Sequence, residues 1–168
     1  MLNYIWLGIA VLLVGADQLI KFWAENTLRQ LETIPLIDGV FHLTYVQNFG
    51  AAFSTMQHKR IFLILMTSVF LLAILILLAT KKLRSPWMVS CWSLVLAGGV
   101  GNLLDRIFRE GGYVVDMFDF RLINFPVFNL ADIFVCVGTG LLIVYLLFFE
   151  KNDQNKNFEI RQEVKRHE

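Results

Sequence analysis

The sequence has few of the side chains on which metal centres and disulfide scaffolds depend. It contains two cysteines, Cys91 and Cys136, which lie inside apolar runs without a CxxC motif. Its three histidines, His42, His58 and His167, are scattered, and no HExxH motif is present. We expect both cysteines to be small core residues, and we predict neither a disulfide nor a metal site.

Motifs for covalent hydrolysis and nucleotide binding are missing as well. The chain has no G-x-S-x-G elbow, no serine paired with a plausible base, and no Walker or dinucleotide-binding loop. We therefore predict no cofactor. The net charge of +1 gives no electrostatic reason to expect a nucleic-acid partner. What the sequence has in abundance is apolar residues, at 57% of its 168 positions, more than ordinary soluble proteins contain.

Four apolar segments are long enough to cross a membrane. About 20 helical residues span a hydrocarbon core of roughly 30 Å, and a helix satisfies its own backbone there. We place the helices at about residues 4–23, 61–79, 87–105 and 127–149. The predicted fold class is a membrane all-α bundle of four transmembrane helices within a single integral-membrane domain, residues 1–150. Residues 151–168 are polar, and we expect a cytoplasmic tail.

The first segment has a second interpretation, as a cleaved signal peptide. Its apolar run is short before Asp17, and the small residues of "VGA" resemble a cleavage site. However, no basic residue precedes the run, and Lys21 and Trp23 suit an anchor at the membrane interface. We therefore favour a retained helix.

The distribution of basic residues predicts the orientation. The short connection "TKKLRSP" between the second and third segments is basic, and so is the tail, whereas the connections 24–60 and 107–126 carry few basic residues. The positive-inside rule then places both termini in the cytoplasm. Lys59 and Arg60 weakly favour the opposite orientation.

In this orientation, the polar and ionisable residues of the helices gather toward the outer face. They lie near the outer ends of the first, third and fourth helices, and they are Asp17, Lys21, Asn102, Asp105, Arg106, Asn129 and Asp132. A carboxylate deep in a membrane costs on the order of 3 kcal/mol, and less near the interface. Residues of this kind are therefore candidates for a functional site.

Each of these residues also has a structural interpretation. Asp17 and Lys21 could be a stabilising i,i+4 pair, and Asp105 with Arg106 could be an interfacial anchor. Asp132 could join two helices by a polar contact. Asn129 and Asp132, three residues apart, lie on one helix face.

The outer connections contribute further candidates. Residues 33–54 contain an Asp-Gly turn, then alternating apolar residues, then "NFGAAFS" with Asn48 and Gly50, and this pattern predicts a short β-element on the outer face. The glycine allows a close backbone approach. Tyr113–Phe120 alternates poorly, and we expect a loop that brings Asp116 near Asp132.

Two carboxylates that lie close together in a low-dielectric site cannot both ionise easily, so one keeps its proton. Such a pair can activate water with one carboxylate and protonate a leaving amine with the other. This chemistry needs neither a metal nor a covalent intermediate. Composition and spacing support an outer polar site with candidate acids, and they do not identify its substrate.

Five motifs, in this order, closely resemble bacterial lipoprotein signal peptidase, also called signal peptidase II. They are "DQLIK" at 17–21, "NFGAAFS" at 48–54, "GGVGNLLDR" at 98–106, "VVDM" at 114–117 and "FNLAD" at 128–132. The resemblance spans roughly residues 10–145. Met117 is a departure, because the family usually has Phe after this aspartate.

The resemblance implies a catalytic dyad of Asp116 and Asp132. The residues it implies for substrate binding or for shaping the site are Asp17, Lys21, Asn48, Gly50, Asn102, Asp105, Arg106 and Asn129. It also implies a β-cradle on the outer face and cleavage of diacylglyceryl-modified prolipoproteins on the N-terminal side of the lipidated cysteine. The expected location is the bacterial inner membrane, in contact with its lipid, and we expect a monomer.

Two other classes compete with this interpretation. A proton-coupled carrier would place its acids near the membrane midplane, often on broken helices. A purely structural membrane subunit would not need an acid in both the fourth helix and the facing loop.

Overall fold

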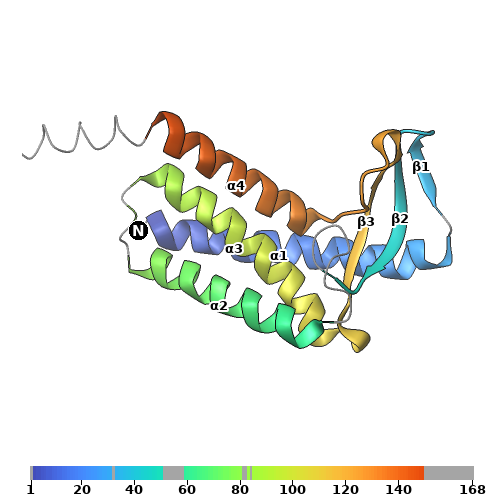
Figure 1. Ribbon diagram of the computed structural model, residues 1–168, viewed down its shortest axis with the longest axis horizontal. Helices are drawn as coiled ribbons and strands as arrows, with labels where there is room; N and C mark the ends of the chain where they lie inside the picture. The colour runs from blue at the N-terminus through green and yellow to red at the C-terminus, as the bar shows by residue number, and fades with distance from the viewer. Residues whose placement is uncertain (1, 32, 51–58, 81–82, 84, 150–168) are drawn as a thin grey trace, which may run out of the picture.

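The computed structural model describes residues 2–31, 33–50, 59–80, 83 and 85–149, and Figure 1 shows a helical bundle with a small sheet at one end. The long helices are α1 (Leu2–Thr27), α2 (Arg60–Ala79), α3 (Pro86–Phe108) and α4 (Leu130–Phe148). All four are long and apolar enough to cross a membrane. The predicted fold class, a four-helix membrane bundle with a small β-element, is therefore confirmed.

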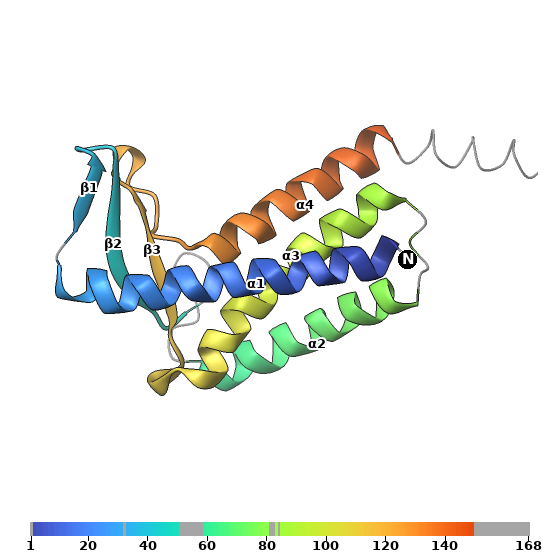
Figure 2. The same ribbon diagram turned by 180° about the vertical axis from the view of Figure 1, so that it is seen from behind.

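Helix α3 is the centre of the bundle, because it packs against α1, α2 and α4. Figures 1 and 2 show the sheet at the bundle end opposite the start of α1. Glycines let α4 approach α3 closely: a Cβ on Gly98 would overlap the carbonyl oxygen of Ala131, and a Cβ on Gly138 would lie 2.8 Å from that of Cys91. The first turn of α4 is thereby held against α3.

Two buried apolar clusters lie in the described structure, one inside the bundle and one where the bundle meets the sheet. One lies mainly between α2 and α3 and contains Leu71, Ile74, Leu78, Val89, Val95 and Leu96. The other lies between the end of α1 and the sheet and contains Ala24, Leu28, Tyr113, Val115 and Met117. Because such packing excludes water, polar groups buried beside it must find protein partners.

The sheet has three antiparallel strands in the order β1 (Ile34–Ile37), β2 (Phe41–Asn48) and β3 (Val114–Phe120). The expectation of a loop over 113–120 is wrong, since most of this segment is β3, paired with β2. Residues 114–117 are all buried, and both α1 and α3 contact the strand. A strand covered on both faces lacks the alternation by which strands are recognised.

A β-bridge joins β3 to the residues before α4. The backbone N–H groups of Met117 and Phe118 donate to the carbonyl oxygen of Phe128 at 3.0 and 2.8 Å, and the N–H of Phe128 donates back to the carbonyl oxygen of Phe118 at 3.1 Å. Helix α4 therefore begins at Leu130 and not at residue 127, because the preceding residues are extended and paired. The bridge fixes β3 against the start of α4.

Arg60 covers the C-terminal end of α3. Its guanidinium donates to the carbonyl oxygens of Arg106 at 2.8 Å and Ile107 at 3.0 Å. The last carbonyls of a helix lack partners within the helix, so this contact satisfies two of them. The side chain passes Gly112, where any Cβ would overlap it and where φ is +72°. This structural role accounts for one of the basic residues that weakly opposed the expected orientation.

Three features used in the sequence analysis fall outside the described residues. They are the "AAFS" part of the 48–54 motif, the basic residues of the short connection between α2 and α3, and the tail at 151–168. The remaining motif residues lie within the described part of the chain.

Candidate active site

Asn129 and Asp132 open α4 with a reciprocal pair of hydrogen bonds. The backbone N–H of Asp132 donates to the Asn129 side-chain oxygen at 3.0 Å, and the backbone N–H of Asn129 donates to an Asp132 carboxylate oxygen at 3.1 Å. This capping box satisfies two backbone donors at the start of the helix. It fixes both side chains at the end of α4 nearest the sheet (Figure 1).

Asp116 lies on β3 and is only 2% exposed. One of its carboxylate oxygens accepts a hydrogen bond from the Asn129 amide at 2.6 Å, and the other accepts one from the Asn48 amide at 3.0 Å. Asn48 is the last residue of β2. Because both carboxylate oxygens have a donor, the buried side chain is held in one orientation.

Asn102, on α3, connects the two candidate catalytic aspartates. Its side-chain nitrogen donates to Asp132 at 2.8 Å, and its side-chain oxygen accepts from Asn129 at 3.2 Å and from the Lys21 ammonium at 2.8 Å. Asp116 and Asp132 are therefore linked through two amides, those of Asn129 and Asn102. Asp132 is partly exposed, whereas Asp116 is buried, so the pair is approachable from the side of Asp132.

The environment of Asp116 favours its protonated form. Burial, followed by the negative charge of Asp132, raises the pKa of Asp116 from 3.8 to about 7. Hydrogen bonds from Asn48 and Asn129 and the charge of Lys21 act in the opposite direction. At neutral pH, Asp116 can therefore hold a proton in a substantial fraction of the molecules.

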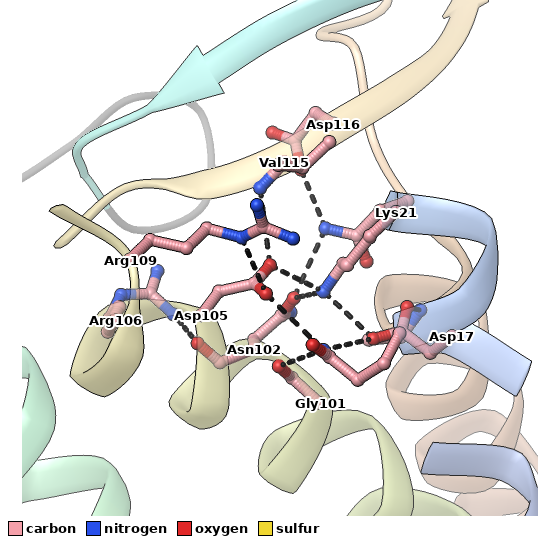
Figure 3. Close-up of polar contacts among 12 residues, drawn as sticks. Asp17, Lys21, Gly101, Asn102, Asp105, Arg106, Arg109, Val115 and Asp116 are labelled. Atoms are coloured by element: carbon pink, nitrogen blue, oxygen red, sulfur yellow. Dashed lines mark hydrogen bonds and ion pairs between the residues drawn. The ribbon is translucent and has the colours of Figure 1, made fainter. Parts of the chain in front are cut away.

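Lys21 lies fully buried at the centre of a second set of contacts (Figure 3). Its ammonium lies 2.9 Å from Asp17, on its own helix, and 3.0 Å from Asp105, on α3. With the hydrogen bond to Asn102, it has an acceptor for each of its three N–H groups. A buried cation needs such complete pairing, since its desolvation otherwise costs on the order of several kcal/mol.

The two acids that bind Lys21 also hold backbone beside the dyad. Asp17 accepts the backbone N–H of Ala131 at 2.9 Å, and Asp105 accepts that of Val115 at 3.3 Å. Ala131 and Val115 immediately precede the two candidate catalytic aspartates. One buried ion-pair cluster therefore fixes the segments that carry both of them.

Arg106 connects α3 to the chain that follows β2. Its guanidinium donates to the carbonyl oxygen of Gly50 at 2.8 Å and to that of Asn102 at 3.2 Å. The backbone N–H of Gly50 in turn donates to the side-chain oxygen of Asn48 at 2.9 Å. This oxygen contact orients the Asn48 amide nitrogen toward Asp116.

The structure brings every site residue expected from the sequence into one connected set of contacts. The set comprises Asp17, Lys21, Asn48, Gly50, Asn102, Asp105, Arg106, Asp116, Asn129 and Asp132. Asp119 does not belong to it, because its carboxylate accepts from Thr44 at 2.7 Å and pairs with Arg121 at 2.8 Å. The catalytic role of the dyad remains a proposal.

The sequence analysis missed four residues that support this set. Gln18 donates to Asp17 at 3.2 Å and to Asp105 at 3.3 Å, while the other three form a group around Asp105, namely Glu25, Arg109 and Tyr113. A spacing signal was available, since Glu25 lies four residues after Lys21 and Arg109 lies four residues after Asp105, which is the spacing of ion pairs in helices.

Within the described part of the chain, no group of three or more His, Cys, Asp or Glu side chains is arranged to hold a metal ion. The acids of the site have amide, ammonium or guanidinium partners instead.

Comparison with known proteins gives consistent matches along the chain. Residues 9–148 match the protein family described as Signal peptidase (SPase) II. A lipoprotein signal peptidase of Clostridioides difficile (strain 630) is 43% identical over 150 residues, covering 89% of this chain and 99% of that protein. One of Streptococcus thermophilus is 40% identical over 140 residues, covering 83% of this chain and 90% of that protein.

Solved structures agree in fold. A bacterial membrane enzyme aligns with a TM-score of 0.78 at 31% identity and covers 88% of each chain. A second bacterial membrane enzyme aligns with a TM-score of 0.74, also at 31% identity, over 84% of this chain and 91% of the other.

Proposed function

The chain belongs to the signal peptidase II family, and on this basis we propose that it is an aspartic endopeptidase that removes signal peptides from prolipoproteins. The proposed bond lies on the N-terminal side of a diacylglyceryl-modified cysteine. The observation that carries the mechanism is the pair Asp116 and Asp132, linked by two amides, with the pKa of Asp116 raised to about 7 by burial and by the charge of Asp132.

In the proposed reaction, the charged Asp132 takes a proton from a water molecule as that water attacks the scissile carbonyl carbon. The proton on Asp116 moves to the carbonyl oxygen, giving a tetrahedral intermediate. When the C–N bond breaks, Asp132 gives its proton to the leaving nitrogen, and Asp116 recovers the hydroxyl proton. The products are a carboxylic acid and an amine, and the dyad returns to its starting state.

The location of the site supports a lipidated substrate. Both aspartates lie where the helices meet the sheet, beside the first turn of α4. If the bundle crosses the inner membrane with its termini in the cytoplasm, this end lies at the outer interface. A cysteine anchored by acyl chains in the outer leaflet presents its neighbouring peptide bond at that depth. The lipid then lowers the entropic cost of bringing the bond to the dyad.

A cleavage assay with matched substrates tests this proposal. The purified protein in detergent is given a diacylglyceryl-modified prolipoprotein, the same protein without the lipid, and a Cys→Ser version. We expect cleavage of the modified substrate alone, with a chelator having no effect, and mass spectrometry should find the new N-terminus at the modified cysteine. Equal cleavage of all three substrates, or cleavage at another bond, contradicts the proposed specificity.

A further inference from the structure

Arg109 forms a second ionic group beside Asp105 (Figure 3). It follows the last turn of α3, and its Nε donates to Asp105 at 2.9 Å. The guanidinium also pairs with Glu25 of α1, and its carbon lies 5.8 Å from the centre of the Tyr113 ring. The Tyr113 hydroxyl donates to the other carboxylate oxygen of Glu25 at 2.6 Å. α1, α3 and the entry to β3 are therefore joined at one point.

Asp105 is the residue through which this group reaches the dyad. It is 1% exposed, and both of its carboxylate oxygens are in use. One oxygen accepts from Arg109 and, at 3.3 Å, from Gln18. The other contacts the Lys21 ammonium at 3.0 Å and accepts the backbone N–H of Val115 at 3.3 Å. A shift of the Asp105 carboxylate would therefore move two groups together. They are the backbone of Val115, next to Asp116, and the Lys21 ammonium, which donates a hydrogen bond to Asn102.

The charges around Asp105 show why one cation does not suffice. The ionisable groups that interact with Asp105 are Asp17 and Lys21 from α1 and Arg106 and Arg109 from the α3 end. Glu25 and Tyr113 lie beyond them, against Arg109. Lys21 is already shared between two carboxylates. Arg109 is therefore the second cation that compensates Asp105, and Glu25 holds that cation in place.

We propose that Arg109 is a positioning residue for the dyad, which with Glu25 holds Asp105 and, through it, Lys21 and the backbone preceding Asp116. The inference rests on the proposed function, because its readout is cleavage. Arg109 touches neither dyad residue in the described contacts, and its side chain is 16% exposed. Its contribution is to geometry and local charge.

Substitution of Arg109 separates positioning from simple stabilisation. In Arg109→Gln, Asp105 loses a charged donor and the neighbourhood loses a positive charge. We expect kcat for the lipidated substrate to fall on the order of tenfold, because small displacements of reacting groups have large effects on rate, with KM unchanged. The dyad should hold its proton more tightly, so the alkaline limb of the pH profile should move up by about half a pH unit. Arg109→Lys keeps the charge and should restore much of the rate.

A matched control is available in Arg121→Gln. Like Arg109, Arg121 pairs with an aspartate, in this case Asp119 of β3 at 2.8 Å. It has no contact with Asp105 in the described structure. We expect parental kcat and a parental pH profile for this variant.

If Arg109→Gln does not fold, Glu25→Gln tests the same arrangement. This variant leaves the Asp105–Arg109 pair charged, but the Arg109 guanidinium loses its ion pair with Glu25. We expect a fall in kcat of about threefold.

The outcomes separate the two proposals. If the parent does not cleave the lipidated substrate, the proposed function is wrong and the role of Arg109 falls with it. If the parent cleaves and Arg109→Gln matches its kcat and pH profile, only the positioning role is overturned. Equal defects in Arg109→Gln and Arg121→Gln, or a parental kcat in Glu25→Gln when Arg109→Gln is unfolded, overturn it as well. A selective, lysine-rescued loss supports it.

Discussion

Asn129 uses both ends of one amide group. Its oxygen accepts the backbone N–H of Asp132 and caps α4, while its nitrogen donates to Asp116 at 2.6 Å and to Asn102 at 3.2 Å. A serine could perform the first task but not the second, because its short hydroxyl cannot replace the reach of the amide. Substitutions at Asn129 can therefore distinguish its contribution to helix stability from its contribution to the proposed chemistry.

Substitution of Asn129 tests this separation. Asn129→Ala removes both contacts, so we expect a loss of about 1 kcal/mol of stability, the usual effect of removing a cap. Asn129→Ser should keep most of the stability. Both variants should lose activity on the order of a hundredfold, because Asp116 and Asn102 lose the same donor. Denaturation and cleavage are measured in one detergent. Parental activity in Asn129→Ser contradicts the assigned role.

Asp116 links stability to pH. Burial and the charge of Asp132 raise its pKa from 3.8, the value expected in the unfolded chain, to about 7 in the folded protein. Between these values the folded state binds more protons than the unfolded state, so stability falls as pH rises through this window. This is the direction for a carboxyl group whose pKa is raised by folding.

The neutral variant Asp116→Asn should lack this pH dependence. We expect it to be more stable than the parent by on the order of 2 kcal/mol at pH 8, with little difference at pH 4, because only the parent must ionise a buried group. Thermal denaturation in detergent at both pH values measures the difference. An advantage of the same size at pH 4 and pH 8 would show that ionisation of Asp116 is not its cause.

At the scale of secondary-structure elements, the site depends on how closely α3 and α4 approach each other. Asn102 and Asp132 lie on these two helices and contact at 2.8 Å. One turn before Asn102, Gly98 faces the Ala131 carbonyl, and its Cβ would also lie 2.8 Å from a Val135 methyl carbon. Because backbone cannot be displaced as easily as a side chain, even alanine should separate the helices here.

Gly98→Ala should therefore impair the site while leaving the helices intact. We expect cleavage to fall by about a hundredfold or more, with a helical circular dichroism spectrum like that of the parent. Gly15→Ala is the control, since a Cβ at Gly15 on α1 would meet no atom within 4 Å. Parental cleavage in Gly98→Ala, or an equal loss in Gly15→Ala, contradicts the dependence on close packing.

The helices were predictable because each is a long apolar run, a signal contained within the segment itself. Strand β3 was not, since burial on both faces removes the alternation that identifies a strand. The start of α4 was placed too early because the pairing of Phe128 with β3 is a long-range contact. The residues of the site were found through intramembrane acids and family motifs. The pairing of Arg109 with Glu25 was missed because it joins the residue after α3 to α1, two segments distant in sequence.

At the scale of the whole molecule, the arrangement is polarised from one end to the other. The buried polar set and the sheet lie at one end of the bundle, and the end of α2 and the start of α3 lie at the other (Figure 2). Such polarity suits a protein whose chemistry takes place at one membrane surface. The proposed orientation places the sheet end outside the cytoplasm.

Cysteine labelling tests this orientation. Asp38, in the turn between β1 and β2, has a 99% exposed side chain, and Ser85 lies at the opposite end, before α3. In a background with Cys91 and Cys136 replaced by alanine, Asp38→Cys should react with a membrane-impermeant maleimide in spheroplasts. Ser85→Cys should react only after the membrane is opened. The reverse pattern would place the site on the cytoplasmic side.

The central claim is that Asp116 and Asp132 together carry out peptide hydrolysis. The measurement that tests it most directly is cleavage of a diacylglyceryl-modified prolipoprotein by the purified parent, Asp116→Asn and Asp132→Asn, all shown to be equally folded. We predict cleavage by the parent, unaffected by a chelator, and a loss of at least about a thousandfold in each variant, because a carboxamide can neither accept nor supply the proton. Cleavage at the parental rate by either variant would contradict the claim.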